Sequence, residues 1–181
     1  VRWVPVGGSD ATGAAGYVLA GRELAADARR AGLTLTDVVV GSSTGGTQAG
    51  LLLGLRSAGC AATVHGVAVY ADATTTTAAV RDLLDRTASL LGTDAPPPDA
   101  VRCDDRTLGD GYGLPSAATL AAVRRAARDE GLLLDPVYSG RAFEYLLDAV
   151  AGGDISPGAT VALVHTGGAP ALFAYDDLLP D

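Results

Sequence analysis

The sequence predicts an α/β fold in which a parallel sheet lies between two layers of helices, giving three layers. Short apolar runs alternate along the chain with segments of helical periodicity, as in strand–helix–strand units with right-handed crossovers. The apolar runs contain few polar residues, which is typical of strands covered on both faces. With 181 residues, 48% of them hydrophobic, the chain is long enough for one such domain, residues 1–181, and too short for two.

The expected elements follow one another in a regular order. Strands are expected at residues 2–6, 37–40, 62–70, 101–103 and 160–164. Helices are expected at residues 14–30, 48–55, 72–91, 115–130 and 143–150. The faces expected to point inward carry Val18, Leu19, Leu24 and Ala28 in the first helix, and Phe143, Leu146, Leu147 and Val150 in the last. Asp72 is placed to cap the third helix, and Gly32 and Gly131 to end the first and the fourth.

Composition excludes several classes of function. The formal net charge is −8 and the basic residues are scattered, so a nucleic-acid partner is not expected. No segment reaches the ~18 apolar residues of a membrane span, which predicts a soluble protein without a membrane partner. The two cysteines lie far apart, outside any metal-binding spacing, which predicts no metal and a reducing cytoplasm. All 13 basic residues are arginine, so no lysine amine is present for chemistry.

A loop of small residues follows the strand at 37–40. Its sequence, from Gly41 to Gly50, is GSSTGGTQAG, and the next helix begins within it. Glycines let a ligand approach the backbone, the hydroxyls of Ser42, Ser43, Thr44 and Thr47 donate hydrogen bonds, and the helix N-terminus favours negative charge. Two interpretations stay open from this stretch alone: a phosphate-binding cradle, or an ordinary glycine-rich turn.

Four unusual loops each follow a strand or a strand-like run. They are residues 41–47, 111–113, 138–140 and 165–168. Ligands of open parallel sheets bind outside the carboxyl ends of the strands, so these loops are expected to converge on one pocket. That pocket would be polar and free of metal, with hydroxyls, two tyrosines and His165. A structural hydrogen bond to backbone is an equally good interpretation of His165, and His65, mid-strand among apolar residues, is expected to be a core residue.

Five motifs at compatible spacing resemble one enzyme family. They are PVGGS at residues 5–9, TGGTQAG at 44–50, GYGLP at 111–115, LDPVYSG at 134–140 and HTGGAPALFAY at 165–175. Together they resemble the D-cysteine desulfhydrase and 1-aminocyclopropane-1-carboxylate deaminase family, pyridoxal-phosphate enzymes of fold type II, the tryptophan-synthase-β type. The resemblance implies that pyridoxal 5'-phosphate is the cofactor, that a small amino acid is the substrate and that the full-length enzyme is a cytoplasmic homodimer.

The resemblance also implies roles for individual residues. The cofactor phosphate would be bound by the loop residues Ser43, Thr44, Gly45, Gly46 and Thr47. Tyr112 and Tyr138 would be the catalytic residues beside the substrate, with Tyr138 close to the cofactor ring. Ser139 and Thr166 would face the pyridine nitrogen. Because a neutral hydroxyl cannot protonate that nitrogen as a carboxylic acid can, the ring would be a weaker electron sink, which β-elimination tolerates.

Two positions separate the branches of this family. The deaminase branch carries glutamate after the tyrosine that corresponds to Tyr138, and leucine after the histidine that corresponds to His165. The present sequence has Ser139 and Thr166 there. It therefore resembles the desulfhydrase branch more closely, although serine replaces that branch's usual threonine at the first position. The implied reaction converts D-cysteine to pyruvate, hydrogen sulfide and ammonia, and deamination of 1-aminocyclopropane-1-carboxylate is the alternative.

The family's cofactor-bonding lysine and its small substrate-gripping domain would both precede Val1. The chain is therefore expected to be the C-terminal part of the large, cofactor-binding domain, and to be inactive alone. Pyridoxal phosphate should give no absorbance band of a lysine-bound cofactor with it. A non-catalytic remnant, or half of a split enzyme, is the alternative from a different class. A nucleotide-binding Rossmann module is disfavoured because the glycine-rich loop lacks the GxGxxG pattern.

Overall fold

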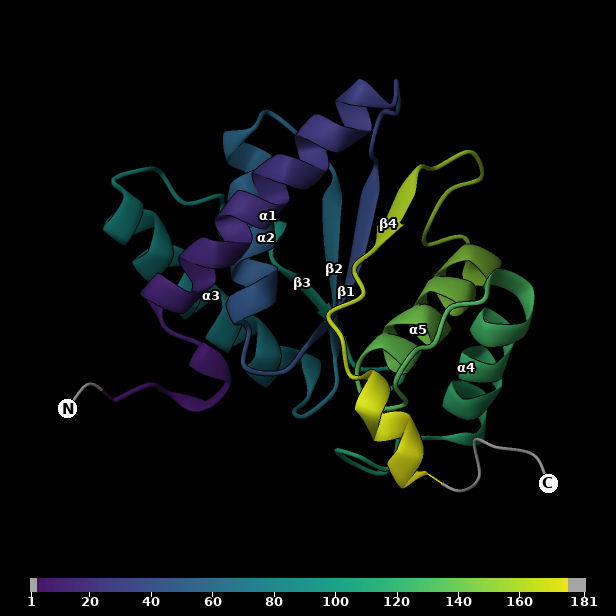
Figure 1. Ribbon diagram of the computed structural model, residues 1–181. Helices are drawn as coiled ribbons and strands as arrows, with labels where there is room; N and C mark the ends of the chain where they lie inside the picture. The colour runs from purple at the N-terminus through teal and green to yellow at the C-terminus, as the bar shows by residue number, and fades with distance from the viewer. Residues whose placement is uncertain (1–2, 176–181) are drawn as a thin grey trace.

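The computed structural model describes residues 3–175 and contains a four-stranded parallel sheet (Figure 1). The strands are β1 (Asp37–Ser42), β2 (Thr63–Ala68), β3 (Arg102–Asp104) and β4 (Val161–Leu163), in the spatial order β3-β2-β1-β4. Val39 of β1 pairs with His65 on one side and with Leu163 on the other. The strand order reverses at β1, because the chain proceeds outward through β2 and β3 and then returns to place β4 on the free side of β1.

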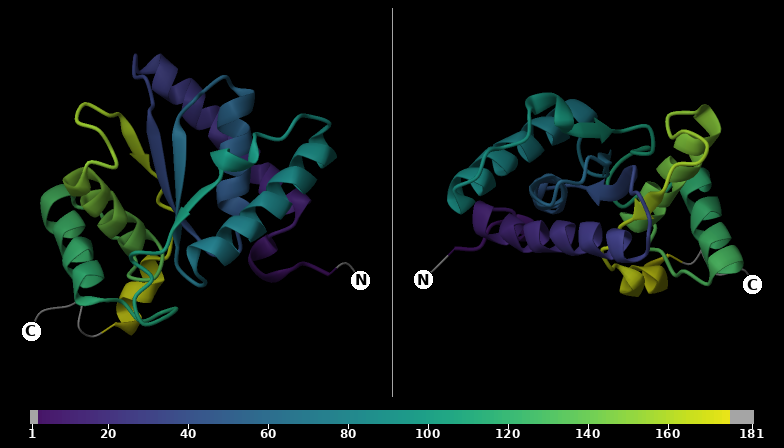
Figure 2. Two further views of the ribbon diagram at one scale, coloured as in Figure 1. Left: turned by 180° about the vertical axis from the view of Figure 1, so that it is seen from behind. Right: turned by 90° about the horizontal axis from the view of Figure 1, so that it is seen from above.

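Helices cover both faces of this sheet, which confirms the predicted three-layer α/β fold (Figure 2). On one face lie α1 (Ala11–Arg30), α2 (Gly46–Ser57) and α3 (Ala73–Leu91). On the other lies α5 (Ser139–Gly152), with α4 (Ala117–Glu130) packed beside it. Successive side chains of β1 alternate between the layers, so Val38 and Val40 join the first core and Val39 joins the second.

Helices α1 and α2 pack closely because glycines line their contact. A Cβ atom on Gly50 would lie 2.3 Å from the carbonyl oxygen of Ala14, and one on Gly54 would lie 2.3 Å from that of Val18. Only hydrogen atoms fit at these points. The contact fixes the position of α2, whose first residues follow the small-residue loop.

The helix ends agree with the sequence signals. Asp72 accepts a hydrogen bond from the backbone N–H of Thr75 at the start of α3. Gly32 follows α1 in the left-handed conformation, with φ 70°. The N–H groups of Gly32 and Leu33 donate to carbonyl oxygens of the last turn and so end the helix. Gly131 ends α4 in the same conformation. Short 3-10 turns occur at Val6–Gly8, Pro98–Ala100 and Ala169–Ala174.

The expected strand at residues 2–6 is wrong for the part that the structure describes. Trp3 to Pro5 have no regular structure, and the 3-10 turn Val6–Gly8 follows. The side chains of Trp3, Val4 and Val6 are exposed. Strand propensity reflects packing on a pleated surface, and no strand among residues 3–175 pairs with this segment. Arg2 lies outside the described residues.

Two expected helix faces also need correction. Leu19 in α1 and Val150 in α5 are exposed, at 66% and 55%. The buried face of α5 instead carries Arg141, Ala142, Tyr145 and Ala149. A polar side chain, Arg141, therefore occupies a position that an apolar pattern would not reveal.

Candidate functional site

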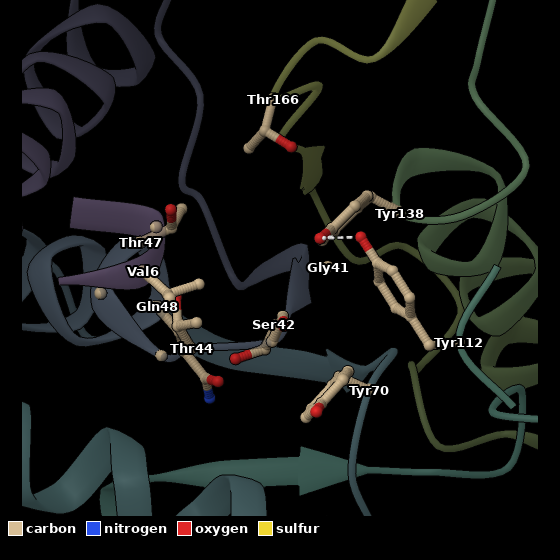
Figure 3. A pocket seen from close by; sticks show the side chains of 14 residues that line it. Val6, Gly41, Ser42, Thr44, Thr47, Gln48, Tyr70, Tyr112, Tyr138 and Thr166 are labelled. Carbon is tan, nitrogen blue, oxygen red and sulfur yellow. Dashed lines mark hydrogen bonds between the residues drawn. The ribbon is translucent and has the colours of Figure 1, made fainter. Parts of the chain in front are cut away.

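A cavity of about 650 Å³ opens at the carboxyl ends of the strands, where the strand order reverses. Ligands of open α/β sheets bind at such switch points. The loop after β1 lines one side of the cavity, and Tyr112 and Tyr138 line the opposite side (Figure 3). Thr166 reaches it from the segment after β4, so the predicted convergence of the loops is confirmed.

The loop side carries the start of α2. Gly45 is the N-cap residue of that helix, in the left-handed conformation with φ 87°, and no side chain caps the helix. The first N–H groups of a helix have no partner within it, so those of Gly46 and Thr47 remain available to an anion. A Cβ atom on Gly45 would lie 3.0 Å from the side chain of Val80 on α3, so glycine is required both for conformation and for space.

Ser42 lies at the end of β1 and is 2% exposed. Its Oγ atom is buried and has no hydrogen-bond partner among the described residues. The side chain lines the cavity, and in Figure 3 its oxygen is seen on the loop side. A buried hydroxyl without a partner is costly, and a polar group of a ligand would satisfy it.

The segment 5–9 closes over the loop. The hydroxyl of Ser9 forms a hydrogen bond with the hydroxyl of Thr44. Val6 and Gly7 complete the same wall of the cavity. A Cβ atom on Gly7 would approach Thr44 Oγ1 to 2.7 Å. The first motif of the sequence therefore folds against the second, as one continuous cradle.

Three tyrosines form the opposite side, which we call the tyrosine wall: Tyr70, Tyr112 and Tyr138. The hydroxyls of Tyr112 and Tyr138 lie 2.8 Å apart and share a hydrogen bond (Figure 3). The ring of Tyr70 meets that of Tyr112 edge to face, at 5.6 Å between centroids. Burial, together with the bond to Tyr112, raises the pKa of Tyr138 to about 12. Tyr138 is therefore a neutral phenol at physiological pH.

A buried carboxylate organises the turn that carries Tyr138. Asp135 is 1% exposed, and its side-chain oxygens accept hydrogen bonds from the backbone N–H groups of Val137, Tyr138 and Ser139. These bonds cap α5 in place of a side chain of Tyr138, which is its N-cap residue. The direction in which Tyr138 enters the cavity therefore depends on Asp135.

Ser139 is not brought to the cavity. Its side chain is 1% exposed and absent from the lining, and its hydroxyl donates to Asp135 Oδ1 at 2.6 Å. The same hydroxyl accepts from the backbone N–H of Asp135 at 2.9 Å. The Ser139 hydroxyl is therefore engaged within the turn, whereas Thr166 lines the cavity. Whether either hydroxyl faces a cofactor ring stays a prediction.

The two histidines have structural partners. His165 is exposed; its Nε2 bonds to the carbonyl oxygen of Leu133, and its Nδ1 accepts from the N–H of Gly167. His65 is buried between Asp37, 2.7 Å from its Nε2, and the hydroxyl of Tyr145, 2.9 Å from its Nδ1. The prediction that His65 is a satisfied core residue is confirmed.

The cavity residues fit pyridoxal phosphate. An uncapped helix start suits the phosphate, and the free Ser42 hydroxyl offers a further hydrogen bond. The cavity volume of about 650 Å³ leaves room for a planar ring. Within residues 3–175 no three metal-ligating side chains gather in one place. In the same range no helix is long and apolar enough to span a membrane.

Comparison with known proteins agrees with this fit. Residues 2–167 match the family described as pyridoxal-phosphate dependent enzyme. The chain belongs to this family. Its fold is thus that of pyridoxal-phosphate dependent enzymes, as the resemblance of the motifs implied. The phosphate-binding role of the loop and the catalytic role of the tyrosines stay predictions.

Individual relatives within the family carry two names. A D-cysteine desulfhydrase of Serratia proteamaculans is 40% identical over 172 residues, which cover 95% of this chain and 52% of the relative. A 1-aminocyclopropane-1-carboxylate deaminase of Burkholderia multivorans is 40% identical over 185 residues, 98% of this chain and 53% of the relative. The chain spans about half the length of these relatives.

A solved structure shows the same fold. It is described as an ACC deaminase homologue, and it superposes with a TM-score of 0.87 at 32% sequence identity. The match covers 97% of this chain and 53% of the solved one. The relatives thus bear the names of desulfhydrases and deaminases, and the match extends over nearly the whole chain.

Tyr70 is a pocket residue to which the sequence assigned no role. It lies two residues after the end of β2, at the same carboxyl edge as the other loops, so the rule that placed Tyr112 and Tyr138 applies to it as well. The sequence pattern likewise assigns no role to Gln48, because it is typical of an ordinary helix residue. Its side chain is fully buried below the loop and donates to the carbonyl oxygen of Arg102 on β3 at 2.8 Å.

Proposed function

We propose that this chain is the C-terminal part of the cofactor-binding domain of a D-cysteine desulfhydrase-like lyase. The whole enzyme would convert D-cysteine and water to pyruvate, hydrogen sulfide and ammonia. Pyridoxal phosphate, when bound, supplies the electron sink for charge at the substrate's α-carbon. The single observation that carries the proposal is the pairing, in one cavity, of an uncapped phosphate-binding helix start with the hydrogen-bonded Tyr112 and Tyr138.

Each side of the cavity has its own task in this proposal. The N–H groups at Gly46 and Thr47 would hold the phosphate, with the Ser43, Thr44 and Thr47 hydroxyls around it. Tyr138 would stand beside the substrate as a neutral phenol, holding its proton at the hydroxyl because its pKa is raised to about 12. Thr166 would offer a neutral hydroxyl to the ring.

The alternative is deamination of 1-aminocyclopropane-1-carboxylate. The name of the Burkholderia relative favours it, at the same identity as the desulfhydrase of Serratia. The residues Ser139 and Thr166 favour the desulfhydrase, because neither supplies the carboxylate or the leucine that the deaminase branch has there. Sulfide release from D-cysteine and 2-oxobutanoate formation from the cyclopropane, measured on the full-length parent enzyme, would separate the two.

The 181 residues contain no lysine. We therefore propose that the amine that bonds the cofactor comes from outside them, and that these residues alone are inactive. An upstream reading frame with a lysine-bearing segment would support one long enzyme, and a separate neighbouring gene would support a split one. With neither, a non-catalytic remnant would be the better proposal. A homodimeric full-length enzyme and a cytoplasmic location stay predictions.

Equilibrium dialysis against pyridoxal phosphate and against pyridoxal tests the cradle directly. We expect the phosphorylated compound to bind reversibly and about 10-fold to 100-fold more tightly, since charge-assisted hydrogen bonds contribute about 1.5–3 kcal/mol. Dialysis should remove it completely, because the chain has no lysine to retain it.

A matched pair of variants locates the binding. Thr47→Val removes a hydroxyl from the cavity lining, and Thr74→Val removes an exposed one from α3. We expect Thr47→Val to weaken binding of pyridoxal phosphate about 2-fold to 10-fold and to leave pyridoxal unaffected, while Thr74→Val changes neither. Equal affinity for both compounds, or equal effects of both variants, would contradict the phosphate cradle.

A further inference from the structure

Arg141 is a fully buried arginine on α5 with an unusual set of partners. Its side chain is 0% exposed. No ion pair joins it to a carboxylate among residues 3–175. Burying a guanidinium away from water without a paired carboxylate is costly, so the hydrogen bonds of the Arg141 guanidinium must offset that cost.

Those bonds go to backbone carbonyl oxygens of two loops. One terminal nitrogen donates to Gly111 at 2.7 Å and to Leu114 at 2.8 Å. The other donates to Val69 at 3.2 Å. The Nε atom is buried and has no hydrogen-bond partner within residues 3–175. A rigid, planar group with several donors can bind carbonyls of separate segments at once, which an ammonium group cannot do in the same way.

The bonded carbonyls flank two members of the tyrosine wall. Gly111 and Leu114 enclose Tyr112, and Val69 immediately precedes Tyr70. The loop around Tyr112 lies outside the described helices and strands, and glycines in left-handed conformations stand on both sides of Tyr112, with φ 149° at Gly111 and 76° at Gly113. The hydroxyl of Tyr175 also donates to the carbonyl oxygen of Gly113. Such a segment has many alternative conformations, and external hydrogen bonds must select one.

Arg141 itself belongs to the element that presents the third tyrosine. It lies three residues after Tyr138, on the first turn of α5. Residues three apart on a helix lie on the same face. One side chain thus connects the start of α5 to the loops that carry Tyr70 and Tyr112, and so sets the distance across which the Tyr112 and Tyr138 hydroxyls meet.

We propose that Arg141 is a positioning residue that assembles the tyrosine wall, by holding the backbones beside Tyr70 and Tyr112 against α5, the helix that Tyr138 precedes. Arg141 is not among the residues that line the cavity, so it would act through the tyrosines. The importance of the tyrosines for a reaction rests on the proposed function. Their assembly does not, so the test below needs neither cofactor nor activity.

The Tyr112–Tyr138 hydrogen bond is the readout. It contributes, after burial, to the raised pKa of Tyr138. The chain is labelled with 3-fluorotyrosine, whose more acidic phenol titrates where the protein stays folded, and the fluorine signal of Tyr138 is assigned with Tyr138→Phe. In the parent chain we expect Tyr138 to titrate above the exposed tyrosines.

Arg141→Met keeps the length of the side chain and removes every donor. We expect it to move the titration of Tyr138 about 1 pH unit downward, toward the ordinary tyrosine value, because Tyr112 is released. Tyr112→Phe should move it in the same direction. Combining the two should add little to either, since both remove one interaction.

Circular dichroism and urea unfolding report whether the variants fold. A merely structural Arg141 would lower the free energy of unfolding and leave the Tyr138 titration in place in a folded variant, which would overturn the proposal. Fully additive shifts would overturn it too. If Arg141→Met does not fold, Arg141→Lys decides: it keeps a charge and some donors, and we expect a smaller downward shift, while an unchanged titration would refute the positioning role.

Discussion

The hydroxyl of Ser42 is expected to lower the stability of the free protein and to favour the binding of a ligand. It is buried at the end of β1 and has no partner among the described residues. A buried polar atom without a hydrogen bond lowers the stability of the free protein, by about 1–3 kcal/mol in typical cases. Ser42 also lines the cavity, where a ligand could supply the missing partner.

We expect Ser42→Ala to leave the free energy of unfolding unchanged or to raise it by about 1 kcal/mol, and to weaken binding of pyridoxal phosphate about 2-fold to 10-fold. Urea unfolding and equilibrium dialysis measure the two effects. Ser57→Ala is the control, because Ser57 bonds to Gly54 and Arg22 at the far end of α2 and should lose stability without losing affinity. A Ser42→Ala chain that binds as tightly as the parent would argue against a ligand contact.

At the same scale, Ser139 shows what a residue pattern leaves undecided. The sequence motifs identify both Ser139 and Thr166 as candidate site residues, but the hydroxyls of these two residues have different surroundings. Ser139 bonds within its own turn to Asp135, and Thr166 lines the cavity. The orientation of a side chain depends on the hydrogen bonds that its neighbourhood offers, and these became visible only with the backbone in place.

Among the elements, the contact between α1 and α2 decides where the phosphate loop stands. The backbones approach so closely at Gly50 that a Cβ atom there would lie 2.3 Å from the carbonyl oxygen of Ala14 and 2.5 Å from the Cβ atom of Tyr17. Because α2 begins at the loop, any separation of the helices would displace the N–H groups that face the cavity.

Two glycine-to-alanine substitutions should therefore have opposite signs. Gly50→Ala forces the helices apart and should lower the free energy of unfolding by about 1–3 kcal/mol. Gly16→Ala adds a methyl group where no atom lies within 4 Å, on the exposed side of α1, and should raise it by about 0.5–1 kcal/mol. Chemical denaturation of both variants measures the two changes in the free energy of unfolding. Changes of the same sign would contradict a tight contact between α1 and α2.

Elements were predictable where their signals are local. The buried strands β1 and β2 and the ends of α1, α3 and α4 follow from apolar runs, caps and glycines. The exposed segment at Trp3 and Val4 has the same apolar character and forms no strand, because no partner strand lies beside it in the described chain. Pairing depends on distant residues, which a local pattern does not contain.

In the molecule as a whole, α5 carries two buried charged side chains, Arg141 and Glu144. Glu144 is 9% exposed and accepts a hydrogen bond from Thr119 of α4 at 2.6 Å. Burial raises the pKa of Glu144, and the bond from Thr119 offsets part of this. A carboxyl group whose folded-state pKa lies above its unfolded value makes its full contribution to stability below the unfolded pKa and loses it as the pH rises through the folded pKa.

The charged form of Glu144 should therefore destabilise the fold at neutral pH. We expect Glu144→Gln to be more stable than the parent at pH 8, with the difference shrinking as the pH falls to about 4 and below. Glu130→Gln, at the exposed end of α4, is the control and should show no such trend. Urea unfolding of the three proteins across this pH range measures it. A difference that grows toward acid would contradict the stated sign.

The sequence by itself determined the order of strands and helices, the shared edge at which their loops meet, and the family, because each depends on short segments and on rules that hold for all parallel sheets. The tertiary structure alone decided which polar groups are satisfied: the free hydroxyl of Ser42, the engaged one of Ser139, and the buried Arg141 behind the tyrosines. The physical reason is that a hydrogen bond needs a partner at the right distance and angle, which depends on the folded backbone; the partners of Arg141 even lie tens of residues away in the chain.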